Sequence, residues 1–294
     1  MTHSHTSSEI QKGLWLVSPH MASRYLHNAS KIVEGNTTLI NGKELEANSI
    51  REVIDPSGRV VNTREEETPA GSIGIVRCIG SMYKYGGWFN WGSDELVAMM
   101  QDFENNPNII GQIHHDDSGG GTVSSVGPYK DFHQNRKKPV VSLLDTSASA
   151  NYWKNAQSDF LMAENDISAM FGSIGVMLSF YDYTKMLTEM GIVEHIIEAD
   201  ESEDKNKAFK LALEGKYELI KKELLSPLAI KFQDHVKAAR PGLKLNTPGI
   251  LSGKMFYAEE AQEIGLIDGI GNMDAAIEKV KFLASARSFI SSNY

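Results

Sequence analysis

The sequence predicts an α/β fold in which parallel strands alternate with crossover helices. Two apolar runs, at 72–79 and at 140–144, have the length and composition of buried strands. Between them, the segment that starts at Ser93 carries apolar residues at helical spacing and ends before Pro107. A helix between two strands indicates a parallel sheet, because a parallel connection must cross over the sheet.

Residues 1–70 are polar and mixed, and a passage rich in Pro, Gly and Glu runs from 55 to 71. We expect an irregular N-terminal arm and cover there, with one short strand at 13–17, and a folded domain over 71–294. His3 and His5 supply only two ligands on a terminal segment, which is fewer than a metal site needs.

The first strand of the domain, 72–79, contains the single cysteine, Cys78. One cysteine cannot form an internal disulfide, and its place in an apolar run predicts a buried, inert thiol. The following loop, 86–92, is aromatic, and two structural roles are open to it. It either covers one end of the sheet or fills a contact between subunits.

The helix that starts at Ser93 places Leu96, Met100 and Phe103 on one face. The next strand begins at Ile109 and runs into the polar tetrad 114–117, which reads His-His-Asp-Asp. Neighbouring strand residues point to opposite faces, so at most two of the four side chains converge on one ion. We therefore expect no metal in this tetrad, and favour a solvated or interface role for it.

Three glycines, 119–121, follow this strand. Their unhindered backbone N–H groups would be suited to hold a developing negative charge, as in an oxyanion hole. Glycine-rich turns also bind phosphates or close tight loops, but this one lacks the Walker lysine pattern and a full GxGxxG motif.

The second strand, 140–144, leads into small residues around Ser149, followed by Tyr152 and Trp153. Ser149 would then sit at the N-terminus of a helix, where a nucleophile could lie beside the glycine turn. The alternative is that serines in such a cluster serve only packing.

In the last third of the chain, apolar residues at spacings of three and four between Phe209 and Leu224 predict a long amphipathic helix. Pro227 should interrupt it, and a second piece should follow through Val236. The charged residues 221–223 would form its solvated face. A final helix is expected over 274–283.

The composition excludes several classes of function. A net charge of −9 over 294 residues gives no basic surface for nucleic acid or anionic lipid, and 41% hydrophobic residues can form a sizeable core. No apolar run reaches the length of a membrane span, and residues 1–8 do not resemble a secretory signal. We expect a protein of the cytoplasm that binds neither membrane nor nucleic acid.

Four motifs resemble one family, the signal peptide peptidase A (SppA-like) group of serine peptidases, which shares the Clp protease/crotonase fold. Residues 117–123 (DSGGGTV) are similar to its D-S-P-G-G-S-V, and 147–153 (SASANYW) to its A-A-S-G-G-Y-W. Residues 172–176 (GSIGV) match its G-S-I-G-V, and 253–271 resembles its C-terminal G-L-[IV]-D motif. The resemblance extends from about Ile73 to Val280, and the layout is similar to soluble head-maturation proteases of phages and prophages.

This resemblance implies that Ser149 is the nucleophile and that the amides of Gly120 and Ala150 form the oxyanion hole. It implies that Ser173 hydrogen-bonds a lysine base, because a serine stands where the Clp branch has its catalytic histidine. It implies no metal and no organic cofactor, and it offers a functional alternative for the aromatic loop 86–92, a place near the substrate groove. Two departures are notable: Gly119 replaces a proline, and Ala150-Asn151 replaces two glycines.

The general base is the weakest part of the resemblance, because 198–209 lacks the family's short stretch around its lysine. Counting from the flanking motifs places that lysine nearest Lys205, with Lys207 as the alternative. Acidic neighbours such as Glu203 and Asp204 would raise the pKa of either amine, which opposes its use as a base near neutral pH.

The function implied is that of a serine endopeptidase with a Ser-Lys dyad, which processes capsid or scaffold proteins of a phage or prophage and works as a homo-oligomer. Three alternatives stay open. One is a catalytically inactive assembly or scaffold subunit, and another is a cytosolic peptide hydrolase. The third is a crotonase-like acyl-CoA enzyme, which would leave the motif around Ser149 unexplained.

Overall fold

The computed structural model describes residues 14–17, 50–87 and 90–292. Its centre is an eight-stranded sheet with the order β10-β8-β6-β4-β3-β2, and β7 and β11 extend it beside β6. The strands are β2 (Arg51–Ile54), β3 (Ser72–Ile79), β4 (Ile109–Ser118), β6 (Val140–Ala148), β7 (Phe160–Ala163), β8 (Met170–Gly172), β10 (Met255–Tyr257) and β11 (Gly269–Ile270).

The sheet is parallel through its centre, since β3, β4, β6 and β8 pair in parallel, as do β6 with β7 and β7 with β11. The two edge pairs, β2 with β3 and β10 with β8, are antiparallel. The α/β fold with parallel strands and crossover helices that the sequence predicts is therefore confirmed.

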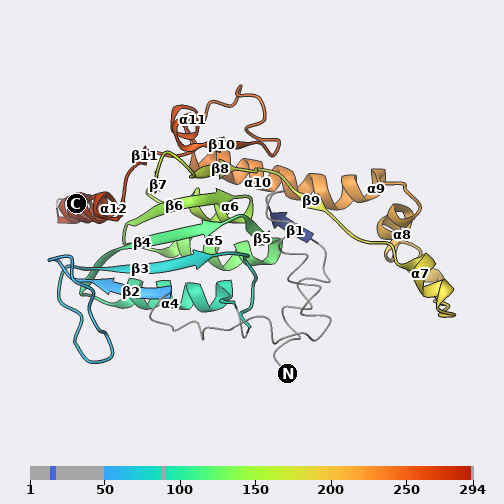
Figure 1. Ribbon diagram of the computed structural model, residues 1–294, viewed down its shortest axis with the longest axis horizontal. Helices are drawn as coiled ribbons and strands as arrows, with labels where there is room; N and C mark the ends of the chain where they lie inside the picture. Colours follow the sequence, from blue (N-terminus) through green and yellow to red (C-terminus); the bar gives the residue numbers. More distant parts are fainter. Residues whose placement is uncertain (1–13, 18–49, 88–89, 293–294) are drawn as a thin grey trace.

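Helices cover both faces of the sheet (Figure 1). One face packs against α4 (Ser93–Asn105), α5 (Val126–Asn135), α6 (Ala150–Asn155) and α10 (Ser226–Ala239), and the other against α12 (Met273–Ser292). The expected apolar face of α4 is confirmed, because Leu96, Met100 and Phe103 are all buried. The short η2 (Val123–Ser125) precedes α5, and α11 (Ala258–Glu263) lies beside β10.

A small second sheet has the order β5-β1-β9 and is antiparallel. It consists of β5 (Gly120–Thr122), β1 (Leu14–Val17) and β9 (Met177–Leu178). The strand expected at 13–17 is thus confirmed. Val17 lies opposite Gly120 in this pairing, so the early strand reaches the glycine turn.

The main sheet begins earlier in the chain than the expected domain boundary at residue 71. Residues 51–54 form β2 and pair with β3, and the side chains of Ile50, Val53 and Val61 are buried in the core. The sequence does not predict β2 because this segment has few apolar side chains. The neighbouring strand β3 supplies the backbone hydrogen-bond partners that such a short strand needs.

From β9 the chain leaves the body as an extended arm (Figure 1). The arm contains α7 (Thr184–Glu189), η3 (Asp200–Ser202), α8 (Lys207–Leu213), α9 (Glu218–Ile220) and η4 (Lys221–Leu225), and it returns to the body through α10. Every residue from 181 to 201 is exposed, so this segment packs little against its own chain.

The predicted break of the long amphipathic helix at Pro227 is wrong. The helix instead ends at Leu213, where Gly215 takes a φ of +77° that glycine adopts without strain. Pro227 lies in the first turn of α10, after η4, a single π-helical segment over Lys221–Leu225. A π-helical turn contains one residue more than an α-helical turn, so one N–H after it makes no regular α-helical hydrogen bond. Pro227, which has no N–H, fits at such a position. Residues 221–223 are exposed, as expected.

The final helix is longer than expected, with α12 ending at Ser292 rather than near 283. Among the described residues, no helix is both long and apolar enough to cross a bilayer.

Candidate active site

Three chain segments that carry the predicted site residues meet at the carboxyl edge of the sheet. β6 ends at Ala148, directly before Ser149, and Ala148 pairs with Gly172 at the end of β8. On the other side of β6, Ser118 at the end of β4 pairs with Ser147, so the turn into β5 and Gly120 follows there. The structure therefore brings the Gly120 turn, Ser149 and Ser173 to one edge.

Ser149 occupies a strained backbone conformation between β6 and α6. Its φ is 56° and its ψ is −120°, a region that residues with a side chain rarely adopt. Two backbone hydrogen bonds hold it there: its N–H donates to Gly172 O and its carbonyl accepts from Trp153 N, both at 2.9 Å. A strained serine at a strand-to-helix turn is typical of a nucleophile presented to a substrate.

The amide of Ala150 is available for an oxyanion hole. Ala150 is the first residue of α6, and the first amides of a helix have no partner within the helix. The partial positive charge at this helix end favours a developing oxyanion beside it.

The second expected donor, the Gly120 amide, already has an acceptor in this structure. Its N–H donates to Ser118 Oγ at 3.1 Å, and Ser118 Oγ in turn donates to Gly80 O. Gly120 has a φ of +100°, which favours glycine, and a Cβ on Gly121 would lie 2.0 Å from Met82 O. To bind an oxyanion, the Gly120 amide must exchange the Ser118 hydroxyl for the substrate oxygen.

Ser173 also has a positive φ, of 52°, and its side chain is buried. Its N–H donates to Lys254 O at 2.9 Å, and it directly follows Gly172, whose carbonyl accepts from Ser149 N. Lys254 itself turns its amine away, to Glu260 Oε1 at 3.3 Å.

Lys205 and Lys207 do not join this cluster within one chain. Both are exposed in the arm, where Lys207 is the first residue of α8 and Lys205 lies two residues before it. The Lys207 amine bonds Asp204 Oδ1 at 2.8 Å, and this hydrogen bond raises the pKa of Lys207. In the described part of the chain, no hydrogen bond joins Ser149 to a lysine amine.

A buried ion pair beneath the site was missed by the sequence reasoning. The Lys154 amine bonds Asp116 Oδ2 at 2.6 Å, and both side chains are 0% exposed. Asn155 also donates to Asp116 Oδ2, at 2.7 Å, and the Lys154 amine lies 4.8 Å from the centre of the Tyr129 ring. This cluster ties the helix that follows Ser149 to the strand that precedes the glycine turn.

The same network continues to the strand that carries the nucleophile. Asn155 Nδ2 lies 3.3 Å from Ser147 Oγ and 3.2 Å from Asn151 Oδ1. The family resemblance expects glycine at position 151, and here the asparagine amide adds a polar contact on the buried side of α6. One signal in the sequence pointed to this pair: Asp116 lies on the inward face of its strand, where a carboxylate needs a partner.

The expected alternation of the tetrad 114–117 is confirmed, but its solvated role is wrong for two members. His114 and Asp116 are buried, and both ring nitrogens of His114 lack a hydrogen-bond partner among the described residues. Burial is the main cause that lowers the pKa of His114 well below its usual value, with the Lys154 charge adding to it. His114 is thus a neutral core residue.

The prediction for Cys78 is confirmed. Its side chain is buried, and burial raises the pKa of its thiol to about 12. The thiol is therefore protonated near neutral pH and is not a nucleophile. In the aromatic loop 86–92, Trp88 and Phe89 lie outside the described residues, and Trp91 packs against the core. No cluster of three or more metal-ligating side chains occurs in the part of the chain that the structure describes.

Comparison with known proteins decides the family. The model of Peptidase family S49 matches residues 131–287, a segment that contains Ser149, Ser173 and the arm. The chain belongs to Peptidase family S49.

Curated proteins named as proteases also match parts of this chain. A protease-named protein of Methanocaldococcus jannaschii is 28% identical over 195 residues, which are 64% of this chain and 61% of that protein. Protease 4 of Haemophilus influenzae is 21% identical over 67% of this chain and 32% of its own length. The S49 chain thus spans less than two thirds of each of these two relatives.

A solved structure, that of a mutant of the membrane-bound stomatin-specific protease 1510-N, is similar at a TM-score of 0.41 and 14% identity. The match covers 73% of this chain and 86% of that one.

Proposed function

We propose that this S49 protein is a serine endopeptidase in which Ser149 is the nucleophile. The observation that carries the proposal is the strained Ser149, held at the carboxyl end of β6 directly before the free amides of α6. Strain of this kind costs about 1–3 kcal/mol and persists where function requires the geometry.

In the proposed reaction, a neutral lysine amine removes the proton of Ser149 Oγ as the oxygen attacks the scissile carbonyl carbon. The carbonyl oxygen becomes an oxyanion, and the amides of Ala150 and Gly120 donate to it. The lysine then gives its proton to the leaving amine, and water hydrolyses the acyl-enzyme by the same route. Ser173 supports the reaction by accepting a hydrogen bond from the lysine amine.

We assign the base to Lys205, supplied by a neighbouring copy of the chain. Within one chain, Lys205 is exposed on an arm that projects away from the sheet (Figure 1). The arm also exposes large apolar side chains, among them Met190 and Val193 at 67% and Ile197 at 93%. Apolar surface of this extent is typical of a contact between proteins.

Burial in such a contact would also exclude water from the lysine amine, which a neutral lysine base requires. Desolvation lowers the pKa of a lysine, so an amine that is protonated on an open arm becomes neutral when a partner subunit excludes water. Lys207 fits the role less well, because its hydrogen bond to Asp204 raises its pKa.

We further propose that the substrate is a capsid or scaffold protein of a phage or prophage, cleaved in the cytoplasm of the host cell. This assignment rests on the layout of the motifs, which resembles that of head-maturation proteases. A second candidate, an inactive assembly subunit, is favoured by one observation: no lysine reaches Ser149 within the described chain.

A fluorophosphonate probe tests the nucleophile directly. The intact oligomer should be labelled at Ser149, and Ser168 serves as an internal comparison, since it is exposed, donates to Asp145 Oδ1 and is not held at a positive φ. An oligomer that is never labelled at Ser149, at any pH from about 7 to about 10, supports the inactive assembly subunit.

Subunit complementation tests the origin of the base. Ser149→Ala and Lys205→Ala variants should each be inactive alone, and their mixture should regain activity, because some mixed sites then combine a wild-type serine with a wild-type lysine. A Lys205→Ala variant that keeps full activity would remove Lys205 from the mechanism, and a matched Lys207→Ala variant then tests the alternative base.

A further inference from the structure

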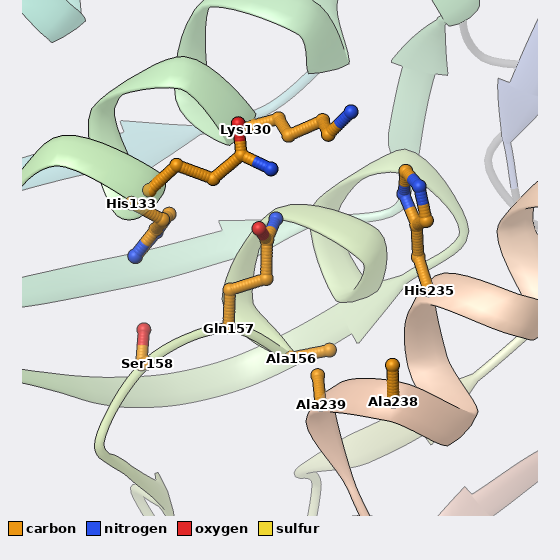
Figure 2. A pocket seen from close by; sticks show the side chains of 9 residues that line it. Lys130, His133, Ala156, Gln157, Ser158, His235, Ala238 and Ala239 are labelled. Atoms are coloured by element: carbon orange, nitrogen blue, oxygen red, sulfur yellow. The ribbon is translucent and has the colours of Figure 1, made fainter.

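A pocket of about 370 Å³ lies at the opposite end of α6 from Ser149 (Figure 2). Three segments form its wall: α5, the loop after α6, and α10. The lining residues are Lys130, His133, Gln134, Ala156, Gln157, Ser158, His235, Ala238 and Ala239. Figure 2 shows Lys130, Gln157 and His235 around one shared space. The proposed hydrolysis uses none of these residues.

The tautomer of His235 is fixed by its neighbour. Trp153 Nε1 lies 2.9 Å from His235 Nδ1, and an indole N–H can only donate. His235 Nδ1 must therefore be the acceptor, so the neutral ring carries its hydrogen on Nε2. His235 thus contributes a donor, not an acceptor, to the pocket.

His133 follows the same logic from a different neighbour. Arg136 Nε lies 3.2 Å from His133 Nδ1, and a guanidinium is also only a donor. The neutral His133 ring therefore carries its hydrogen on Nε2, and this buried nitrogen has no hydrogen-bond partner in the described chain. Burial, with Arg136 and Lys154 nearby, lowers the pKa of His133 well below its usual value, which keeps the ring neutral.

The remaining polar groups add donors and one positive charge. Gln157 Nε2 is buried without a partner in the described residues, and Lys130 has no ion-pair partner there. The nearby carboxylates are already paired: Asp159 with Arg136 at 2.6 Å, and Asp234 with Lys237 at 2.7 Å. The wall therefore presents N–H donors and a cation whose charge is not neutralised.

We propose that this pocket binds a small anion with two or more acceptor oxygens, a carboxylate or a phosphate, between Lys130, Gln157 and the Nε2–H group of His235. Such a ligand accepts from the unpaired Gln157 amide and from His235, and it neutralises the Lys130 charge. The volume fits a small molecule or the end of a peptide.

A bound anion would also lie beside the residues that hold α6 against α10. His235 accepts from Trp153, and the Trp153 ring stacks on Phe232 of α10 at 4.5 Å and 7°. The pocket therefore adjoins the contact that joins α10 to the helix behind Ser149.

Isothermal titration calorimetry on the full chain tests the proposal with three probes: inorganic phosphate, a tripeptide with a free carboxyl terminus, and the same tripeptide as its amide. Binding of phosphate or of the free tripeptide, with no binding of the amide, is expected. The phosphate and tripeptide arms decide which anion the pocket prefers. The proposal is overturned if neither anion binds up to about 10 mM, or if the amide binds as well as the acid.

Two variants place the binding in this pocket. Lys130→Met should weaken anion binding by about tenfold or more, because it removes a charge-assisted hydrogen bond. The control is Lys222→Met, an exposed lysine of η4 outside the pocket, and it should bind like the wild type. An equal loss in both variants would show general attraction to surface charge and overturn the proposal.

Nuclear magnetic resonance of the histidine rings gives a second, independent readout. The charges facing His235 are Lys130 and Lys231, which lower its pKa beside the larger effect of burial, and Asp234, which raises it. A bound anion favours the protonated ring, so the pKa of His235 should rise on binding. A pKa of His235 that stays constant at saturating anion contradicts the assignment.

Discussion

The edge around Ser149 and the arm that carries Lys205 are built in opposite ways. Ser149 is 1% exposed, and the network behind it is fully buried, whereas Ile197 on the arm is 93% exposed. The nucleophile is thus positioned within one chain, while the proposed base lies on a surface that still has apolar area to bury. Half of the proposed dyad is preorganised by folding, and the other half depends on assembly.

The largest effect should come from removing the nucleophile. Ser149→Ala should reduce hydrolysis by about 10⁴-fold or more, since the other members of a catalytic unit contribute little without it. Circular dichroism and the oligomeric state should not change, because alanine fits the same buried turn. A matched Ser168→Ala variant should keep full activity. Undiminished hydrolysis in Ser149→Ala would place the nucleophile elsewhere.

The buried ion pair offers the next largest effect. Lys154→Met leaves Asp116 buried without its cation and should lower the free energy of unfolding by about 3–5 kcal/mol. The double variant Lys154→Met/Asp116→Leu should recover most of this loss, because two apolar side chains need no partner. Urea denaturation measures both. If the double variant is as unstable as the single one, the pair is not what links α6 to β4.

Two substitutions test whether the Gly120 N–H holds the oxyanion, because both disturb the backbone in the same way. Gly120→Ala and Gly120→Pro both disturb a φ of +100°, but only proline also lacks the N–H. If this amide holds the oxyanion, kcat should fall about 10²-fold further in the proline variant than in the alanine variant. Equal kcat values would remove Gly120 from the oxyanion hole.

Lowering the pH should reduce the free energy of unfolding, because His114 and His133 are buried as neutral rings. Burial lowers the pKa of both rings well below their usual value, so below about pH 6.5 the unfolded chain binds more protons than the folded one. The free energy of unfolding should therefore fall as the pH drops from about 7 to about 5, by up to about 1.4 kcal/mol per pH unit for each histidine.

The matched variant for this effect is His114→Phe, which keeps a ring in the core but cannot take up a proton. Its unfolding free energy should depend less steeply on pH than that of the wild type. An identical slope in both proteins would mean that His114 does not remain neutral in the folded core.

The smallest expected effect measures the strain at the nucleophile. Glycine adopts the conformation of Ser149 more readily than alanine, so Ser149→Gly should be more stable than Ser149→Ala by about 1 kcal/mol. Thermal unfolding of the two inactive variants gives this difference. A Ser149→Ala protein that is the more stable of the two would argue against a strained turn.

Much of the body could be predicted from local pattern. The helical spacing of Leu96, Met100 and Phe103 and the apolar run that leads to Ser149 are signals that a few neighbouring residues determine, and both elements formed as predicted. That Ser149 and Ser173 belong to one site was implied by the family resemblance, and the parallel pairing of β6 with β8 brings both residues to one edge.

Other features depend on partners distant in sequence. Lys154 reads as a solvated helix residue until Asp116, 38 positions earlier, places a carboxylate in the same buried layer. The helix break at Gly215 was missed because apolar spacing continues across it, and a positive φ leaves no trace in that spacing. The base is harder still to predict, since in our proposal the contact that activates it joins two chains.

The π-helical segment η4 sets the direction of the arm. Each residue of an α-helix advances the chain by about 100° around the axis, and a π-turn accommodates one residue more than an α-turn. Deleting one residue within Lys221–Leu225 would restore regular α-helical geometry and rotate α8 by about 100° relative to α10. The rotational phase of one short helical segment thus determines which way Lys205 faces, and with it which neighbour its amine can reach.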